Sequence, residues 1–481
     1  MENKHSKNLA PEEIQHDTSL AKNSLKLIYV YAIATGAIFT FIAYLDTVFI
    51  AYCGPATFFA FALMTLLILP IAFVYCELAP MFHKAGGELI YNTVGINKHV
   101  GFLAAWMMLA TWSVVPVFSI TAILQWLNRV AGLGLSMENI LIGGIIILVI
   151  FCVISLGEIK TAGKIQLFML VGAVVATVVS TIAIFFSGHW HLSNFTPFFK
   201  STLGGGGFSG WLIGLGLIVT PFFGFETVPQ MVEEGDFPIK DSHKAIWGSV
   251  VTCGIIYVLF FLAIAGLGSF SDLLHLGSNG EVGVSFLSIT AMEEILGWAV
   301  WAVIFGAFAH LFSVGTCFLG FWISTVRLMY AMGKQNFLPK VFSYVNKKKQ
   351  PILPNLFLLA ISLIYYVVMN TTTFINDFFN LMSFCCSVTY SLTMISAIRM
   401  KIKYPEWERP YKLKGGMFTN VLALCFALCI VFLCSLGLGW GTWRSLLIYL
   451  GIGALIWLWM FIFKWPKSKV VITTPGGEME Y

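Results

Sequence analysis

About twelve long apolar runs limit this chain more than any other feature of its sequence. Hydrophobic residues fill 58% of the 481 positions and charged residues only 11%, against about 25% charged in soluble domains. Each run is long enough to cross ~30 Å of hydrocarbon at about 1.5 Å per residue. Because a segment in lipid must satisfy its own backbone hydrogen bonds, we predict an all-α integral membrane protein. The runs are 26–52, 54–80, 100–128, 138–156, 161–187, 209–231, 245–268, 294–326, 353–370, 374–398, 417–439 and 443–464.

Basic residues sort unevenly between the two sides of these runs. If the N-terminus is inside, 25 of the 28 Lys and Arg residues lie in inner loops or tails, and only Arg129, Lys200 and Arg444 lie outside. The positive-inside rule therefore predicts a multi-pass protein of the cell (plasma or inner) membrane with both termini in the cytoplasm. The net charge of +5 then reflects the lipid bilayer and this topology, and no nucleic-acid partner is expected.

The chain divides into one membrane domain and two tails. Residues 1–25 are polar and are expected to be a cytoplasmic N-terminal tail, disordered or lying on the membrane surface. Residues 26–465 form the predicted transmembrane domain, and 466–481 are expected to be a short, loose cytoplasmic tail. Most of the ten cysteines lie inside apolar runs and form no CxxC pair, so neither a cofactor nor a metal is predicted from them.

Two of the apolar runs are interrupted near mid-membrane, five segments apart. The first interruption contains Thr35 and Gly36, and the second contains Gly224 between Pro221 and Pro229. Gly and Pro weaken helical hydrogen bonding where water cannot replace it, so such breaks persist where backbone groups line a cavity or bind a ligand. Breaks at matching places in two halves are typical of secondary transporters. We therefore expect discontinuous helices 1 and 6 in a 5+5 inverted repeat, about 26–187 and 209–398, with two extra helices at about 417–464.

The first interruption offers chemistry for an amino acid. A helix opened at Thr35 and Gly36 would present free N–H groups to a carboxylate and free C=O groups to an ammonium. The alternative is that Gly36 only lets another helix pack closely.

Glu226, at the second interruption, has two interpretations. A carboxyl group inside a membrane helix is costly and is a candidate functional group, so Glu226 could bind and release a proton during transport. It could equally be a structural acid, hydrogen-bonded to loose backbone at the break.

Three further polar residues are candidates for binding a substrate or an ion. Asp46 lies about ten residues, or ~15 Å, beyond Gly36, where it could select cationic substrates or simply reach the outer interface. Ser313 and Thr316 could supply oxygens to a sodium ion between segments 1 and 8. No Lys or Arg lies deep in a segment, so neutral or cationic substrates are favoured over dicarboxylic ones.

Residues 27–414 resemble the amino acid-polyamine-organocation superfamily of transporters, typified by bacterial leucine and arginine/agmatine carriers. The resemblance rests on five motifs in the correct order. They are Gly36-Ala37-Ile38-Phe39, the stretch from Glu77 to Glu88, Gly224-Phe225-Glu226 running into 233–240, the loop from Arg327 to Pro339, and the stretch from Tyr404 to Tyr411.

The resemblance implies roles for particular residues. It implies that Thr35, Gly36 and Ala37 bind a substrate carboxylate, and that Glu226 is the gate or proton-linked acid. It also implies that Phe222, Phe223 and Gly224 provide backbone contacts to the substrate. Met108 and Phe321 stand where the arginine/agmatine carrier has aromatic residues against its substrate.

The chain also departs from the family pattern. Thr220 stands where the arginine/agmatine carrier has a gating tryptophan, and Gly172 and Ala173 stand about where some proton-driven members have a lysine. Segment 1 lacks the usual Gly-Ser-Gly triplet and has extra residues before Gly54, so the register around Asp46 is open.

Together these features predict a secondary transporter that moves an amino acid or related amine by alternating access, coupled to H⁺ or working by exchange. Na⁺ is the alternative coupling ion. The alternative is a nutrient sensor on a transporter scaffold, which binds ligand without flux. The chain has no HExxH or GxSxG motif, so no enzyme is expected. The sequence does not indicate an oligomeric state.

Overall fold

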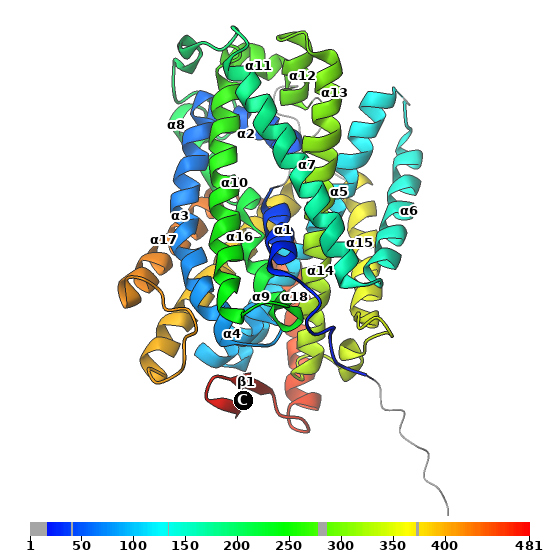
Figure 1. Cartoon of the computed structure of the whole chain (residues 1–481), viewed down its shortest axis with the longest axis vertical. Coiled ribbons are helices and arrows are strands. Elements are labelled where there is room, and N and C mark those ends of the chain that lie inside the picture. Colours follow the sequence, from blue (N-terminus) through cyan, green and yellow to red (C-terminus); the bar gives the residue numbers. More distant parts are fainter. Residues whose placement is uncertain (1–16, 40–41, 133, 278–285, 372–374) are drawn as a thin grey trace, which may run out of the picture.

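The computed structural model describes residues 17–39, 42–132, 134–277, 286–371 and 375–481, and most of them are helical (Figure 1). In the first half the main helices are α1 Leu27–Ile38, α2 Ile42–Cys53, α3 Thr57–Leu78, α4 Gly87–Gly95, α5 Lys98–Ala131, α6 Met137–Ser155 and α7 Ile159–Phe185. In the second half they are α8 Gly207–Leu217, α9 Val228–Met231, α10 Ser242–Ala265, α11 Phe270–Leu276, α12 Leu287–Glu294, α13 Ala299–Phe305, α14 Ser313–Lys334, α15 Ile352–Thr371, α16 Ile375–Lys403, α17 Gly416–Leu436 and α18 Trp440–Trp459.

Several short turns join or extend these helices. The 3₁₀ turns are η1 Gly54–Ala56, η2 Ala79–Met81, η3 Leu192–Phe195, η4 Thr220–Phe222, η5 Phe225–Thr227, η6 Val232–Glu234, η7 Ile239–Asp241 and η10 Lys340–Ser343. Two π-helical turns, η9 Gly306–Phe312 and η11 Met460–Lys464, adjoin α14 and α18.

Eleven helical stretches among the described residues are long and apolar enough to cross a membrane, so this is a multi-pass, all-α membrane protein. The sequence predicted about twelve, and the difference lies in the first segment. There α1 is a separate apolar helix of 12 residues, while α2 forms one 39-residue stretch, Ala43–Met81, with η1 and α3. The 5+5 repeat and its boundaries stay a prediction.

The first segment is interrupted, but about one turn later than its sequence predicted. Gly36 lies inside α1, which continues to Ile38, and Phe39 leaves the helical conformation with ψ of 72°. The next helix, α2, begins at Ile42. Gly36 does not open the helix because a single Gly costs only about 1 kcal/mol in a helix interior, which close packing can offset.

The sixth segment is interrupted where its sequence predicted. It runs from α8 through η4 to η5 and α9, with Gly224 between the two 3₁₀ turns at φ 143° and ψ −32°. A residue with a side chain rarely adopts this backbone conformation. Pro221 and Pro229 each stand within the first two positions of a helical turn, where proline needs no N–H donor.

Helix α1 lies in the middle of the molecule (Figure 1) and packs against α10, α7 and α14. Its contact with α14 depends on small residues. A Cβ atom at Gly36 would lie 2.7 Å from Cβ of Thr316, and a Cβ at Gly320, one turn further along α14, would lie 3.2 Å from Cβ of Ala37. Close packing of this kind is typical of helices that associate in lipid. The surroundings of Gly36 therefore match the alternative in which this glycine lets another helix pack closely.

The C-terminal tail is ordered, which corrects the expectation of a loose end. Strands β1 Val471–Thr474 and β2 Gly477–Glu480 form an antiparallel hairpin. Val470 and Ile472 are buried, and Asn336 donates a hydrogen bond to the Lys469 carbonyl oxygen at 2.8 Å. Both the hairpin and the described start of the chain lie at the lower end of the molecule in Figure 1.

Candidate functional site

The two interrupted segments touch each other in the centre of the molecule. A Cβ atom at Gly224 would lie 2.7 Å from the backbone nitrogen of Ile38 and 2.8 Å from Cβ of Ala37. These distances are shorter than van der Waals contact, so only glycine allows this approach. The interruptions of segments 1 and 6 therefore touch at the end of α1, beside Ala37 and Ile38.

The main-chain oxygens at the end of α1 have hydrogen-bond partners, although the sequence suggested unpaired groups there. The Tyr257 hydroxyl donates to the Ile38 carbonyl oxygen and lies 3.3 Å from that of Pro221. The Thr316 hydroxyl lies 3.1 Å from the Gly36 carbonyl oxygen. The Cys253 thiol also lies 3.6 Å from the Thr35 carbonyl oxygen. The last four carbonyls of a helix lack intrahelical partners further along the helix, and here side chains of α10 and α14 contact three of them.

This geometry changes the expected chemistry of Thr35, Gly36 and Ala37. Because all three lie inside α1, their N–H groups belong to helical turns, and they stand at the carbonyl end of the helix, which is the negative end of its dipole. Carbonyl oxygens suit an ammonium group rather than a carboxylate. Free N–H groups are instead expected at the start of α2, from Ile42 onward, while residues 40–41 lie outside the described residues.

Glu226 is buried and accepts three hydrogen bonds from three parts of the fold. Its Oε2 accepts from the Gly224 backbone N–H at 2.9 Å and from the Tyr390 hydroxyl at 3.0 Å. Its Oε1 accepts from Nε1 of Trp112 at 3.2 Å. An indole N–H and a backbone N–H can only donate, so the surroundings are those of an ionised carboxylate. Glu226 thereby ties the interruption to α5 and α16.

Aromatic rings surround this contact. Phe222, Phe223 and Phe225 are buried around Gly224. The Tyr257 ring packs edge-on against Phe222, and the Tyr390 ring stacks on Phe225 with centroids 5.5 Å apart. The structure therefore gives segment 6 an apolar shell at its point of interruption.

The other residues implied by the family pattern are also buried. Met108 lies on α5 and Phe321 on α14, two helices that pack together. Thr220 shares a hydrogen bond of 2.7 Å with Ser383 of α16. Their contact with a substrate stays a prediction.

The sequence did not predict three aromatic residues of the site, Trp112, Tyr257 and Tyr390. Each stands in an ordinary apolar helix, and Trp112 and Tyr390 lie 114 and 164 residues from Glu226. No local pattern marks them, because only the packing of α5, α10 and α16 brings them to the interruption.

Asp46 lies neither at the outer interface nor at a vestibule. It is fully buried, and its Oδ2 accepts from the Ser288 backbone N–H at 2.7 Å, while Oδ1 accepts from that of Thr47 at 2.7 Å. Ser288 is the second residue of α12. A carboxylate is stabilised at a helix N-terminus, so Asp46 joins α2 to α12 from inside the protein.

The sodium candidates Ser313 and Thr316 already make hydrogen bonds. The Ser313 hydroxyl donates to the His310 carbonyl oxygen at 3.0 Å, and Thr316 contacts α1 as described above. The residue of α7 that reaches this place is Gln166, whose Nε2 donates to the Thr316 carbonyl oxygen at 2.7 Å. Gly172 instead faces Phe312 of η9.

An ion pair holds α14 to the end of segment 6. Arg327 and Glu234 are both buried, with two nitrogen-oxygen contacts, one of them 2.9 Å. The Glu234 carbonyl oxygen accepts from the backbone N–H groups of Ser24 and Leu25 at 2.9 and 3.0 Å. Such a pair must be broken or moved as a unit if segment 6 separates from α14.

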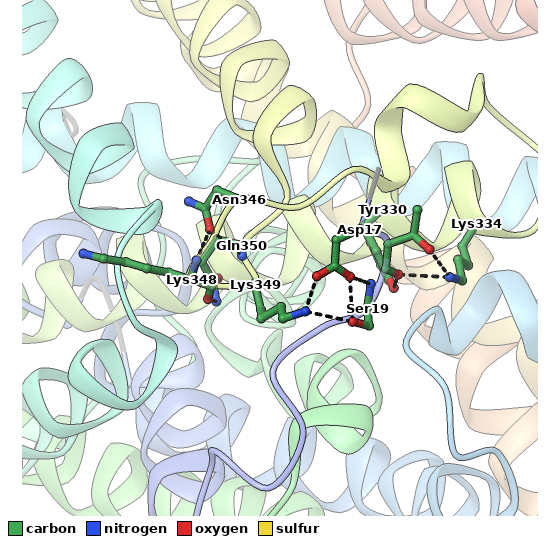
Figure 2. Close-up of polar contacts among 9 residues, drawn as sticks. Asp17, Ser19, Tyr330, Lys334, Asn346, Lys348, Lys349 and Gln350 are labelled. Carbon is green, nitrogen blue, oxygen red and sulfur yellow. Dashed lines mark hydrogen bonds and ion pairs between the residues drawn. The ribbon is translucent and has the colours of Figure 1, made fainter. Parts of the chain in front are cut away.

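Residues 17–25 are attached to the same region, which corrects the expectation of a disordered or surface-lying tail for this part. Asp17 pairs with Lys349, and both bond to the Ser19 side chain (Figure 2). The Lys349 ammonium holds the pKa of Asp17 below its usual range. Tyr330 and Lys334 of α14 donate to the Thr18 carbonyl oxygen at 2.7 and 2.9 Å. Residues 1–16 lie outside the described residues.

Comparison with known proteins agrees with this architecture. The family model described as amino acid permease matches residues 25–461. The chain is 25% identical to the glutamate/serine transporter AimA of Bacillus subtilis, over 81% of this chain and 72% of that protein. It is 24% identical to the aspartate-proton symporter of Bacillus subtilis, over 93% and 85%. It is 23% identical to the branched-chain amino acid permease BcaP of the same organism, over 87% of each chain.

Proposed function

This chain belongs to the amino acid permease family, and from that premise we propose that it moves an amino acid or related amine across the cell membrane by alternating access. The observation that carries the proposal is the contact between the interruptions of segments 1 and 6, at Ile38 and Gly224. Half-helix ends that meet near the middle of a membrane protein offer backbone dipoles to both charges of an amino acid.

The proposed substrate site lies between the end of α1, the start of α2 and the turn from Phe222 to Gly224. Thr35, Gly36 and Ala37 contribute the carbonyl end of α1, which favours the substrate ammonium. Met108 and Phe321 are proposed to face the substrate side chain from α5 and α14. Glu226 is proposed as the gate, because it holds the turn of segment 6 to α5 and α16 through hydrogen bonds.

We propose neutral or cationic amino acids as substrates. Arg327 is a buried cation among the described residues, but it is already paired with Glu234. It is therefore not available to the side-chain carboxylate of an acidic amino acid. The relatives are named for acidic as well as neutral amino acids, so a test of specificity has to include glutamate and aspartate.

The proposed orientation places both termini in the cytoplasm, because that arrangement puts most Lys and Arg residues on the inner side. Coupling to protons or exchange is proposed for the energy source, and one relative is named as a proton symporter. In this orientation the Arg327–Glu234 pair and residues 17–25 close the cytoplasmic side, and they would separate when the substrate is released inward.

Counterflow in proteoliposomes tests the proposal directly. Purified protein is reconstituted with one unlabelled amino acid inside, and entry of the same labelled amino acid is followed for leucine, serine, lysine, glutamate, aspartate and a decarboxylated amine. A transporter accumulates label transiently, whereas a nutrient sensor binds ligand without counterflow. Binding with no counterflow for any of these compounds would contradict the transport function and favour the sensor.

A pair of glycine substitutions locates the site in the same assay. Gly224→Ala should abolish counterflow, because its Cβ atom would lie 2.7 Å from the Ile38 nitrogen at an unfavourable φ. Gly451→Ala is the matched control, because a Cβ there meets nothing within 4 Å. Normal counterflow by the Gly224 variant would exclude the proposed site.

A further inference from the structure

A second buried carboxyl group, Glu88, lies near the interruption of segment 6. Glu88 is the second residue of α4, directly after Gly86 and Gly87, and it is fully buried. Helix α4 lies toward the end of the molecule that carries the hairpin (Figure 1) and packs against α5 and α16. Glu88 therefore stands between the centre of the molecule and one of its two surfaces.

The hydrogen bonding of Glu88 is much poorer than that of Glu226. Its Oε2 accepts one bond, from Nε2 of Gln230 at 3.2 Å, and its Oε1 accepts none. The backbone N–H of Glu88 and the Tyr75 hydroxyl also face this carboxyl group, but the Tyr75 hydroxyl does not reach hydrogen-bond geometry with any partner. A buried carboxylate with one neutral donor is costly, whereas a protonated carboxyl group can donate a hydrogen bond itself.

The ionisable groups around Glu88 do not compensate its charge. Tyr75 of α3, Tyr91 of α4 and the Glu226 carboxylate face it. Nearby cations of the described residues pair with other acids, namely Lys84 with Glu233, Arg327 with Glu234, and Lys401 with Glu77. Burial, together with repulsion from Glu226, raises the pKa of Glu88 to about 8.

The protonation state of Glu88 can be transmitted to segment 6 through one side chain. Gln230 stands on α9, just after the interruption. Its Nε2 donates to Glu88, and its Oε1 accepts from the Gly86 backbone N–H at 3.1 Å. A change of charge on Glu88 therefore changes the strength of the connection between α9 and α4.

A chain of aromatic residues also connects the two acids. The rings of Tyr75 and Tyr390 lie edge-on with centroids 6.1 Å apart, and the Tyr390 hydroxyl donates to Glu226. Glu226 and Glu88 thus flank one polar cluster, in which Glu226 is satisfied as a carboxylate and Glu88 is not.

From this difference in hydrogen bonding we propose that Glu88 is the group that binds and releases the coupling proton, while Glu226 keeps its charge and positions the interruption. The proposal rests on the proposed transport function with proton coupling. The step is a simple proton transfer: solvent gives a proton to the Glu88 carboxylate, and the carboxyl group returns it to the cytoplasm when α9 and α4 separate.

Transport by wild type, Glu88→Gln and the matched control Glu158→Gln, an exposed glutamate, tests the proposal. We expect Glu88→Gln to retain counterflow but to lose accumulation driven by an inward proton gradient, with a flat pH profile of uptake. Glu158→Gln should behave as wild type. Unchanged gradient-driven accumulation by Glu88→Gln overturns the proposal. Absence of counterflow in the wild type would instead refute the transport function itself.

Infrared difference spectroscopy gives a second readout that does not require transport. Spectra of the purified protein on the acid and alkaline sides of pH about 8 should show the C=O band of a protonated carboxyl group disappearing. The band should remain in Glu226→Gln and should shift in frequency in Glu88→Asp. The Asp variant keeps a carboxyl group at this position, so it serves if Glu88→Gln fails to fold. Loss of the band in Glu226→Gln, or no titrating band in the wild type, overturns the proposal.

Discussion

Replacing Glu226 with Gln should destabilise the protein, because the NH₂ group of Gln would face a buried N–H donor that now bonds to the carboxylate. The Gly224 N–H, the Tyr390 hydroxyl and the Trp112 indole N–H converge on the two carboxylate oxygens. The amide oxygen of Gln can occupy only one of the two oxygen positions. Its NH₂ group then faces either Trp112 or Gly224, neither of which can accept a hydrogen bond.

The size of this effect follows from the kind of bond that is lost. A hydrogen bond to a charged group contributes about 1.5–3 kcal/mol, and an unsatisfied buried donor costs about 1–3 kcal/mol. Trp112→Phe removes the indole N–H and some volume, and in this variant the Gln amide can turn its NH₂ away from any donor. We expect the double variant to be about 1.5–3 kcal/mol more stable than the sum of the single effects, which is about 10- to 150-fold in an equilibrium constant.

The four proteins of this cycle can be compared by unfolding in mixed detergent micelles, followed by far-ultraviolet circular dichroism. The cycle subtracts the cavity that Trp112→Phe leaves, because that cavity is present in both backgrounds. Single effects that add within about 0.5 kcal/mol, as for independent sites, would show that Trp112 does not donate to Glu226.

Four other predictions concern the packing and the charges. Gly36→Ala should lower stability by about 1–3 kcal/mol through overpacking, and Thr316→Gly should restore part of it in thermal melts; an unaltered Gly36→Ala melt would disprove the close contact. Arg327→Met should lower the free energy of unfolding by about 3–5 kcal/mol, because it leaves the Glu234 charge buried and unpaired, whereas the double variant Arg327→Met with Glu234→Leu should be about as stable as wild type. Equal losses of stability in both variants would argue against the buried pair. Asp46→Ala should cost about 0.5–2 kcal/mol through loss of the α12 cap without changing the ratio of lysine to leucine uptake; a changed ratio would restore a role in selection. The pKa of Glu88 rises from 4.5 to about 8 in the fold, so between these pH values the folded protein binds more protons than the unfolded chain. The free energy of unfolding of the wild type should therefore fall as the pH rises through this window, and that of Glu88→Gln should fall less.

The sequence predicted the membrane helices and the interruption of the sixth segment. Apolar run length indicated the membrane helices, and Pro221, Gly224 and Pro229 marked the second interruption because helices cannot continue through them undisturbed.

What the sequence missed depends on contacts between distant segments. Gly36 has the same local pattern whether it opens a helix or admits Thr316, and only the packing of α14 decides between them. Asp46 was placed by its distance from Gly36, but its partner Ser288 is 242 residues away. Tails composed of polar residues looked loose because the surfaces that hold them, such as Tyr330 and Lys334, lie elsewhere in the chain.

The most direct measurement is an experimental structure of the protein with a transported amino acid bound in lipid nanodiscs. We predict density for the amino acid beside Ile38 and the start of α2, with its other side against the turn from Phe222 to Gly224. The ammonium should approach the carbonyl end of α1. Substrate density away from both interruptions, or a sixth segment that runs through Gly224 as a continuous helix, would contradict the account.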